Sequence, residues 1–153
     1  MSGESFTIIF NSRGKNVLNN TSLNAVVYDV NWDSFLPKKY RKFYCQFVFK
    51  SENYNGNLVD NGFVNMNFGR VNMFDGYSNT NNLGMVYPVS LVANSSFYNS
   101  TNNDNNNFWM DYPTSTQVTV SLKNFAGVNM GNMPNYCLIL SMVGITDENI
   151  DND

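Results

Sequence analysis

Hydrophobic and polar residues alternate along most of the chain, and a period of two predicts β-strands. Clusters of Asn, Gly, Asp and Pro separate the alternating segments, as expected for turns in an antiparallel sheet. The alternating segments lie at residues 6–10, 23–32, 40–50, 64–68, 83–98 with an interruption at Pro88, 116–122 and 136–145. Helical periodicity is hard to find anywhere. The pattern therefore predicts an all-β protein.

Two of these segments carry the clearest signals. In residues 40–50 the face predicted to point into the core is entirely apolar, and it consists of Phe43, Cys45, Phe47 and Phe49. The opposite face is polar except at Val48. Residues 136–145 are apolar on both faces apart from Ser141 and Gly144, which is typical of a central strand with neighbours on both sides.

The chain has 153 residues, which is the size of one domain. About eight strands with turns between them predict an antiparallel two-sheet β-sandwich or jelly roll. We expect one domain over residues 1–146 and an acidic flexible tail over residues 147–153. Residues 51–57 are predicted to form a polar loop, and the Asn-rich run 99–107 an exposed one.

The sequence contains no histidine and two cysteines, and this excludes several kinds of active site. Ser-His-Asp and Cys-His catalysis and His-based zinc sites all need an imidazole. Cys45 and Cys137 lie in apolar segments and are predicted to be buried hydrophobes rather than ligands. The acidic residues lie mostly in turn-like contexts, where Asp is the ordinary turn residue. We therefore expect no enzyme, no cofactor and no metal.

The net charge of −3 and the pI near 4.7 give no general attraction to nucleic acid or anionic lipid. No segment has the length and apolarity of a membrane span. The first residues lack the pattern of a secretory signal, so a cytosol-like compartment is expected.

One basic cluster precedes the clearest strand and consists of Lys38, Lys39, Arg41 and Lys42. Four cations in five residues could contact an acidic partner, and the chain's own acidic tail on a neighbouring copy is one candidate. Alternatively, lysines at the beginning of a strand keep a sheet edge soluble. The sequence leaves both interpretations open.

Trp109 and Tyr112 are candidate exposed aromatics beside the Asn-rich run. Aromatic rings and amide side chains together favour sugar binding, because rings stack on sugars and amides bond to hydroxyl groups. The competing interpretation is that these rings fill the core, as most aromatics of a β-sandwich do.

Four segments together resemble a known family: residues 40–52, 64–74, 82–88 and 132–140. In order, they carry the Tyr40 strand, a strand ending at Gly69, the Leu83-Gly84 strand, and the final Pro-Asn-Tyr-x-Leu-x-Leu strand. This order is similar to that of small single jelly-roll minor capsid proteins encoded by large DNA viruses of protists and algae and by virophages. The resemblance covers roughly residues 5–146 and includes no catalytic signature.

The resemblance implies a non-catalytic virion component that assembles in the host cytoplasm and links or underlies the capsomers. Its expected partners are the major capsid protein, other minor capsid proteins and other copies of itself. The main alternative is a carbohydrate-binding, lectin-like β-sandwich module. A β-sandwich adhesion or cytokine-like oligomer is a third interpretation.

Overall fold

The structure is a computed structural model that describes residues 3–14, 17–19, 25–54, 62–67, 82–88, 95–98, 107–123 and 135–146. Within these residues it contains strands and one short 3-10 helix. The elements are β1 (Ser5–Asn11), β2 (Val17–Asn19), β3 (Ala25–Asp29), η1 (Trp32–Ser34), β4 (Lys42–Tyr54), β5 (Gly62–Asn67), β6 (Asn82–Pro88), β7 (Ser95–Tyr98), β8 (Asn107–Asp111), β9 (Gln117–Lys123) and β10 (Tyr136–Ile145). Every strand pair is antiparallel, which confirms the all-β prediction.

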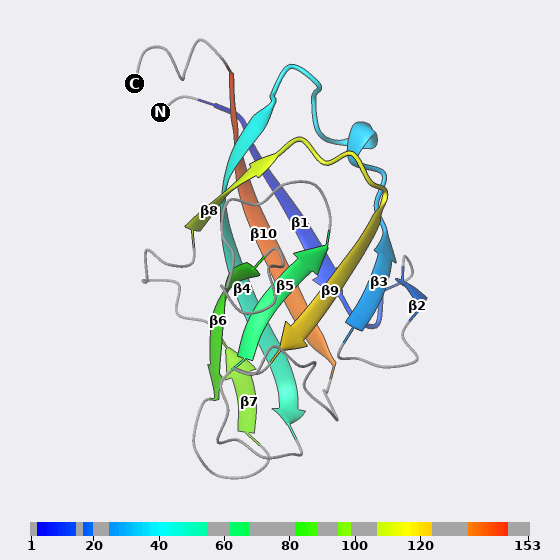
Figure 1. The fold of residues 1–153 in the computed structure, drawn as a ribbon, viewed down its shortest axis with the longest axis vertical. Coiled ribbons are helices and arrows are strands. Elements are labelled where there is room, and N and C mark those ends of the chain that lie inside the picture. The colour runs from blue at the N-terminus through cyan, green and yellow to red at the C-terminus, as the bar shows by residue number, and fades with distance from the viewer. Residues whose placement is uncertain are drawn as a thin grey trace.

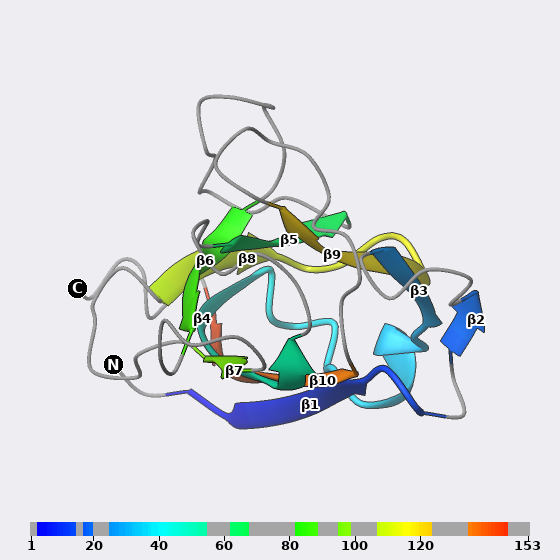
Figure 2. The same ribbon diagram turned by 90° about the horizontal axis from the view of Figure 1, so that it is seen from below.

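The strands form two layers that face each other (Figures 1 and 2). Layer A contains β1, β10 and β4, and both β7 and β8 pair with β4. Layer B contains β2, β3, β9, β5 and β6. Because β6 also pairs with β7, one continuous hydrogen-bonded ladder runs through both layers, from β1 at one end to β2 at the other.

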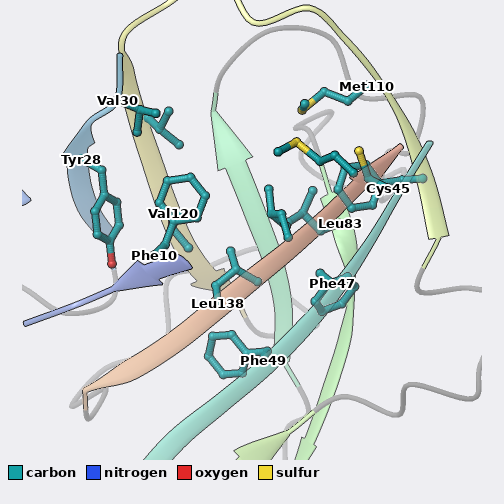
Figure 3. Close-up of a cluster of buried hydrophobic side chains, with 14 of the residues drawn as sticks. Phe10, Tyr28, Val30, Cys45, Phe47, Phe49, Leu83, Met110, Val120 and Leu138 are labelled. Carbon is teal, nitrogen blue, oxygen red and sulfur yellow. The ribbon is translucent and has the colours of Figure 1, made fainter. Parts of the chain in front are cut away.

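The hydrophobic core fills the space between the layers. Figure 3 shows Phe47, Phe49 and Leu138 from layer A in one cluster of buried side chains with Tyr28 and Val120 from layer B. Successive residues of a strand point to opposite faces, so each strand contributes every second side chain to this core. The predicted inward face of residues 43–49 is confirmed, because Phe43, Cys45, Phe47 and Phe49 are at most 2% exposed.

The predicted central position of the last strand is confirmed. β10 pairs with β1 along Ser5–Asn11 and with β4 along Lys42–Ser51. The registers align Ile8, Leu140 and Phe47 across three strands. Both ladders run without a register shift, so the three strands form the regular part of layer A.

The prediction of a polar loop from residue 51 onward is wrong for residues 51–54, because these residues continue β4. These residues stay extended because the ladder has partners for them on both sides. The Glu52 N–H donates to the Asn135 carbonyl at 2.8 Å, and Asn53 and Tyr54 pair with β7. Ser51 is buried, and its hydroxyl donates to the Glu52 carbonyl at 2.7 Å.

The strand predicted over residues 23–32 ends earlier than expected. β3 ends at Asp29, and Trp32 begins the 3-10 turn η1. The indole N–H of Trp32 donates to the Ser115 carbonyl at 3.0 Å, so the ring stays buried after the chain has left the sheet. Asn107, which was predicted to be in the Asn-rich loop, begins β8 because it pairs with Gln46 of β4.

Several predictions fall outside the described residues. They concern the acidic tail over residues 147–153, the Asn-rich run over residues 99–106, residues 55–57 of the polar loop, and residues 68–74 and 132–134 of the family-like segments. Cys45 is buried as predicted, whereas Cys137 is only half-buried, and both are free thiols. Among the described residues, no helix is long and apolar enough to cross a membrane.

Candidate protein-contact face

The outward side chains of β1, β10, β4 and β8 lie in register on the outer side of layer A. Because opposite residues of an antiparallel pair share a face, the pairing arranges these side chains in rows across the strands. The first row is Ser5, Val143, Tyr44 and Trp109, the second is Thr7, Ser141, Gln46 and Asn107, and the third is Ile9, Ile139 and Val48. We call these three rows the outer face.

The outer face contains no charged side chain. In its third row Ile9 is 56% exposed and Val48 is 38% exposed, and the half-buried Ile139 lies between them. In the first row the rings of Tyr44 and Trp109 are in contact, with centroids 5.0 Å apart. Apolar side chains that lie next to one another at the surface of a folded protein are candidates for contact with a partner.

Charged residues border the outer face at both ends. At one end Lys42 pairs with Asp111 in the β4–β8 ladder. At the other end Lys50 and Glu52 of β4 are exposed, and Glu52 forms an ion pair of 3.0 Å with Arg13. Protein interfaces have a centre depleted of charge, in which aromatic residues are enriched, and a polar rim. The outer face and its borders have this distribution.

The predicted basic cluster is partly neutralised by carboxylates of the same chain. Lys38 forms an ion pair of 3.8 Å with Asp33, and Lys39 forms one of 3.1 Å with Glu4. The Tyr40 hydroxyl also donates to Glu4 at 2.8 Å. Hydrogen bonds from Tyr40 and then Lys39 lower the pKa of the Glu4 carboxyl.

Arg41 and Lys42 are exposed beside these pairs, and within the described part of the chain neither has a carboxylate within ion-pair distance. Two of the four cations of the cluster are therefore paired with carboxylates of the same chain. Its role as a partner-contact patch remains a prediction.

The two candidate aromatics are half-buried rather than exposed, and they have different surroundings. Trp109 packs against Tyr44 on the outer face. The ring of Tyr112 packs against the buried Phe43, with centroids 6.1 Å apart. The Tyr112 hydroxyl donates to Asp33 at 2.7 Å, and burial together with this contact raises the pKa of Tyr112 to about 12. The two rings therefore do not form a shared stacking platform.

A pocket of about 360 Å³ lies at the Lys50 end of layer A. Its lining residues are Asn11, Arg13, Lys50, Ser51, Glu52, Asn135, Tyr136 and Cys137. Asn135 connects to the turn that follows β1. With its amide oxygen facing Arg13, it accepts from Arg13 Nε at 2.8 Å, and its amide nitrogen donates to the Ser12 hydroxyl at 2.8 Å. The pocket has two cations, Arg13 and Lys50. Arg13 contacts Glu52 and Asn135, whereas Lys50 has no ion-pair partner in the described part of the structure.

Among the described residues, no three His, Cys, Asp or Glu side chains lie close enough together to hold a metal ion. Sequence reasoning noted Val48 as an exception on a polar face but did not identify the outer face. Only the strand register shows that Val48 lies in a row with Ile9 and Ile139.

Comparison of the chain with protein-family models and with curated proteins gives no match.

Proposed function

We propose that this chain is a structural virion component, a minor capsid protein that links or underlies the capsomers of an icosahedral shell. The observation that carries this function is the uncharged outer face of layer A with its charged borders. The partners would be the major capsid protein and other minor capsid proteins, with assembly in the host cytoplasm. No catalysis is involved.

The finer fold that goes with this function is a single jelly roll. The ladder neighbours support it: β1, β10, β4 and β7 follow one another in layer A, and β3, β9, β5 and β6 in layer B. Apart from the consecutive pair β5 and β6, neighbouring strands in these two series come from distant parts of the chain, as in two interleaved Greek keys. Because viral capsid and lectin domains both use jelly rolls, the fold alone does not choose between them.

The outer face favours a role in assembly over small-molecule recognition. Its side chains form rows across neighbouring strands, which suits contact with another protein surface. In a shell the same contact is repeated many times, so a weak individual contact is sufficient for stable attachment. The free thiols of Cys45 and Cys137 suit a reducing compartment such as the cytoplasm.

The first test is quantitative peptide mass spectrometry of purified, protease-treated particles of the encoding virus. We expect the chain at a fixed ratio to the major capsid protein. Its absence from the particles would contradict a shell function.

A second test addresses the outer face. We expect Val48→Lys to fold normally but to be lost from particles, because it introduces a charge into the uncharged outer face. Gln117→Lys is the matched control, since Gln117 is exposed on layer B. Equal incorporation of both variants would contradict a contact through the outer face.

The pocket beside Lys50 favours one second candidate, a carbohydrate-binding module. Amide, cationic and carboxylate side chains that converge on about 360 Å³ are the groups that orient a polar ligand. Glycan-array binding that is lost in Lys50→Ala and retained in Lys123→Ala would support this candidate. A lack of glycan binding by the unmodified chain would exclude it for the glycans tested.

A further inference from the structure

Strand β1 lies at one end of the ladder and has one described neighbour, β10. Its even-numbered residues direct their backbone groups toward β10. The Gly144 N–H donates to the Glu4 carbonyl at 2.9 Å, and the Ser12 N–H donates to the Tyr136 carbonyl at 3.1 Å. Because hydrogen-bonded pairs alternate along an antiparallel ladder, the N–H and C=O groups of Ser5, Thr7 and Ile9 point to the other edge. No described strand pairs with this edge, and we call it the open edge.

This edge lacks the features that normally prevent pairing with another strand. Proteins protect exposed edges with charged side chains, proline, bulges or short strands. β1 has seven residues, Ser5–Asn11, with no charge and no proline. Its register with β10 has no bulge. By contrast, β2 at the other end of the ladder has three residues and an irregular register.

The side chains of β1 are also incompletely covered. Ile9 on the outer face is 56% exposed. Phe6, Ile8 and Phe10 face the opposite side of β1, toward the core. Phe10 is fully buried there, but Phe6 and Ile8 are only half-buried. A strand added at this edge would cover Phe6 and Ile8 and part of Ile9.

We infer that β1 pairs antiparallel with β1 of a second copy of this chain, with Ile8 on the two-fold axis. In this register Thr7 lies opposite Ile9 of the second copy, and Ser5 lies opposite Asn11 of the second copy. These are hydrogen-bonded pairs, so the pairing satisfies the open backbone groups of Ser5, Thr7 and Ile9 in both copies. Ile8 meets Ile8 of the second copy in a non-hydrogen-bonded pair, where side chains are closest.

The charges at the ends of β1 favour the antiparallel direction. Glu4 precedes the strand and Arg13 follows it in the next turn. Each also has an ion-pair partner in its own chain, Lys39 for Glu4 and Glu52 for Arg13. Antiparallel pairing brings Glu4 of one copy toward Arg13 of the other, whereas parallel pairing would bring like charges together. A two-fold axis also uses the same edge of both copies, so the assembly closes as a dimer instead of growing into a fibre.

The dimer would join the two outer faces into one uncharged surface. It depends only on the open edge of β1, and it would exist whether or not the chain is a shell protein. The two ideas are separable by experiment because Val48, two strands away from β1, belongs to the outer face and not to the edge.

The first experiment measures molecular mass against concentration by sedimentation equilibrium. We expect a reversible dimer for the unmodified chain and for the control Val48→Lys. We expect monomers for Thr7→Pro, which removes an edge donor without removing a bond to β10, and for Ile9→Lys, which adds an edge charge. Circular dichroism checks that each variant is folded. A monomeric unmodified chain, or a dimer that persists in folded Ile9→Lys, would overturn the inference.

The second experiment tests the register by cross-linking. In a Cys137→Ser background, Ile8→Cys should form an intermolecular disulfide under mild oxidation, because Cα atoms of a non-hydrogen-bonded pair are about 4.5 Å apart and suit a disulfide. Thr7→Cys should not, because Thr7 faces a different residue of the second copy. Absence of the Ile8→Cys cross-link, or equal cross-linking of both variants, would overturn the proposed register.

Discussion

Individual side chains matter most in the centre of the core, where Phe47 is fully buried between the layers. We expect Phe47→Ala to lower the free energy of unfolding by about 3–5 kcal/mol, because the removed ring leaves a cavity. Chemical denaturation measures this loss. Lys50→Ala, on the outer side of the same strand, is the control and should change stability by no more than about 0.5 kcal/mol. A loss below about 1 kcal/mol for Phe47→Ala would contradict its place in the core.

Among the described residues, the hydroxyl groups of two buried tyrosines, Tyr28 and Tyr136, lack hydrogen-bond partners. The ring of Tyr28 packs on Phe10 at 5.0 Å, and that of Tyr136 stacks on Phe49 at 5.2 Å. Their hydroxyls lie near each other, but neither makes a hydrogen bond of good geometry. Burial raises the pKa of Tyr28 to about 12 and raises the pKa of Tyr136 strongly, so the folded chain keeps both phenol protons at pH values where an exposed tyrosine ionises.

These tyrosines predict a loss of stability in alkali. Above about pH 10 the unfolded chain releases tyrosine protons that the folded chain still holds, so rising pH favours unfolding. We expect the free energy of unfolding to fall above about pH 10, and to fall less steeply in the double variant Tyr28→Phe with Tyr136→Phe. At pH 7 the double variant should be as stable as the unmodified chain or more stable, because an unsatisfied buried hydroxyl costs about 1–3 kcal/mol. Urea denaturation at several pH values measures both effects, and equal alkaline slopes would contradict this explanation.

Among the elements, strand β6 contains a local irregularity that depends on glycine. Gly84 is buried and has a φ of 154°. The β5–β6 register shifts between Val64 and Asn65, next to the pair that Val64 makes with Gly84. A positive φ of this kind is costly for a residue with a Cβ.

We therefore expect Gly84→Ala to destabilise the protein by about 1–3 kcal/mol through backbone strain. Thermal unfolding followed by circular dichroism measures the loss. A melting temperature equal to that of the unmodified chain would show that β6 accommodates a Cβ at this position without strain.

At the scale of the whole molecule, the described residues share one core between two layers that are joined through β6 and β7, so the layers should unfold together. The two tryptophans lie in different parts of the structure: Trp32 is buried near Phe10, with ring centroids 6.4 Å apart, and Trp109 contacts Tyr44 on the outer face. In Trp109→Phe the fluorescence reports on Trp32, and in Trp32→Phe it reports on Trp109. We expect each fluorescence midpoint in denaturant to coincide with the circular dichroism midpoint of the same variant. Separate midpoints would mean that the surroundings of Trp32 and of Trp109 unfold independently.

Local patterning was sufficient to predict most of the strands and their inward faces, but not β2 or β8, which lie outside the predicted strand segments. The alternation around Phe47 and the two-sided apolarity of residues 136–145 depend only on neighbours in the sequence, because the pleat sends successive side chains to opposite faces. The same alternation predicts that Cys45 is buried. The lack of histidine in the sequence excludes His-dependent chemistry by composition alone.

Only the tertiary structure decided which distant residues lie together. Ser51–Tyr54 remain in β4 because β10 and β7 offer ladder partners, and no local pattern contains that information. Lys39 is neutralised by Glu4, more than thirty positions away in the sequence. The row of Ile9, Ile139 and Val48 and the open edge of β1 likewise come from strand order and register. Strand order and register depend on contacts between segments that are distant in the sequence. The alternation of polar and apolar residues, by contrast, is a property of adjacent residues.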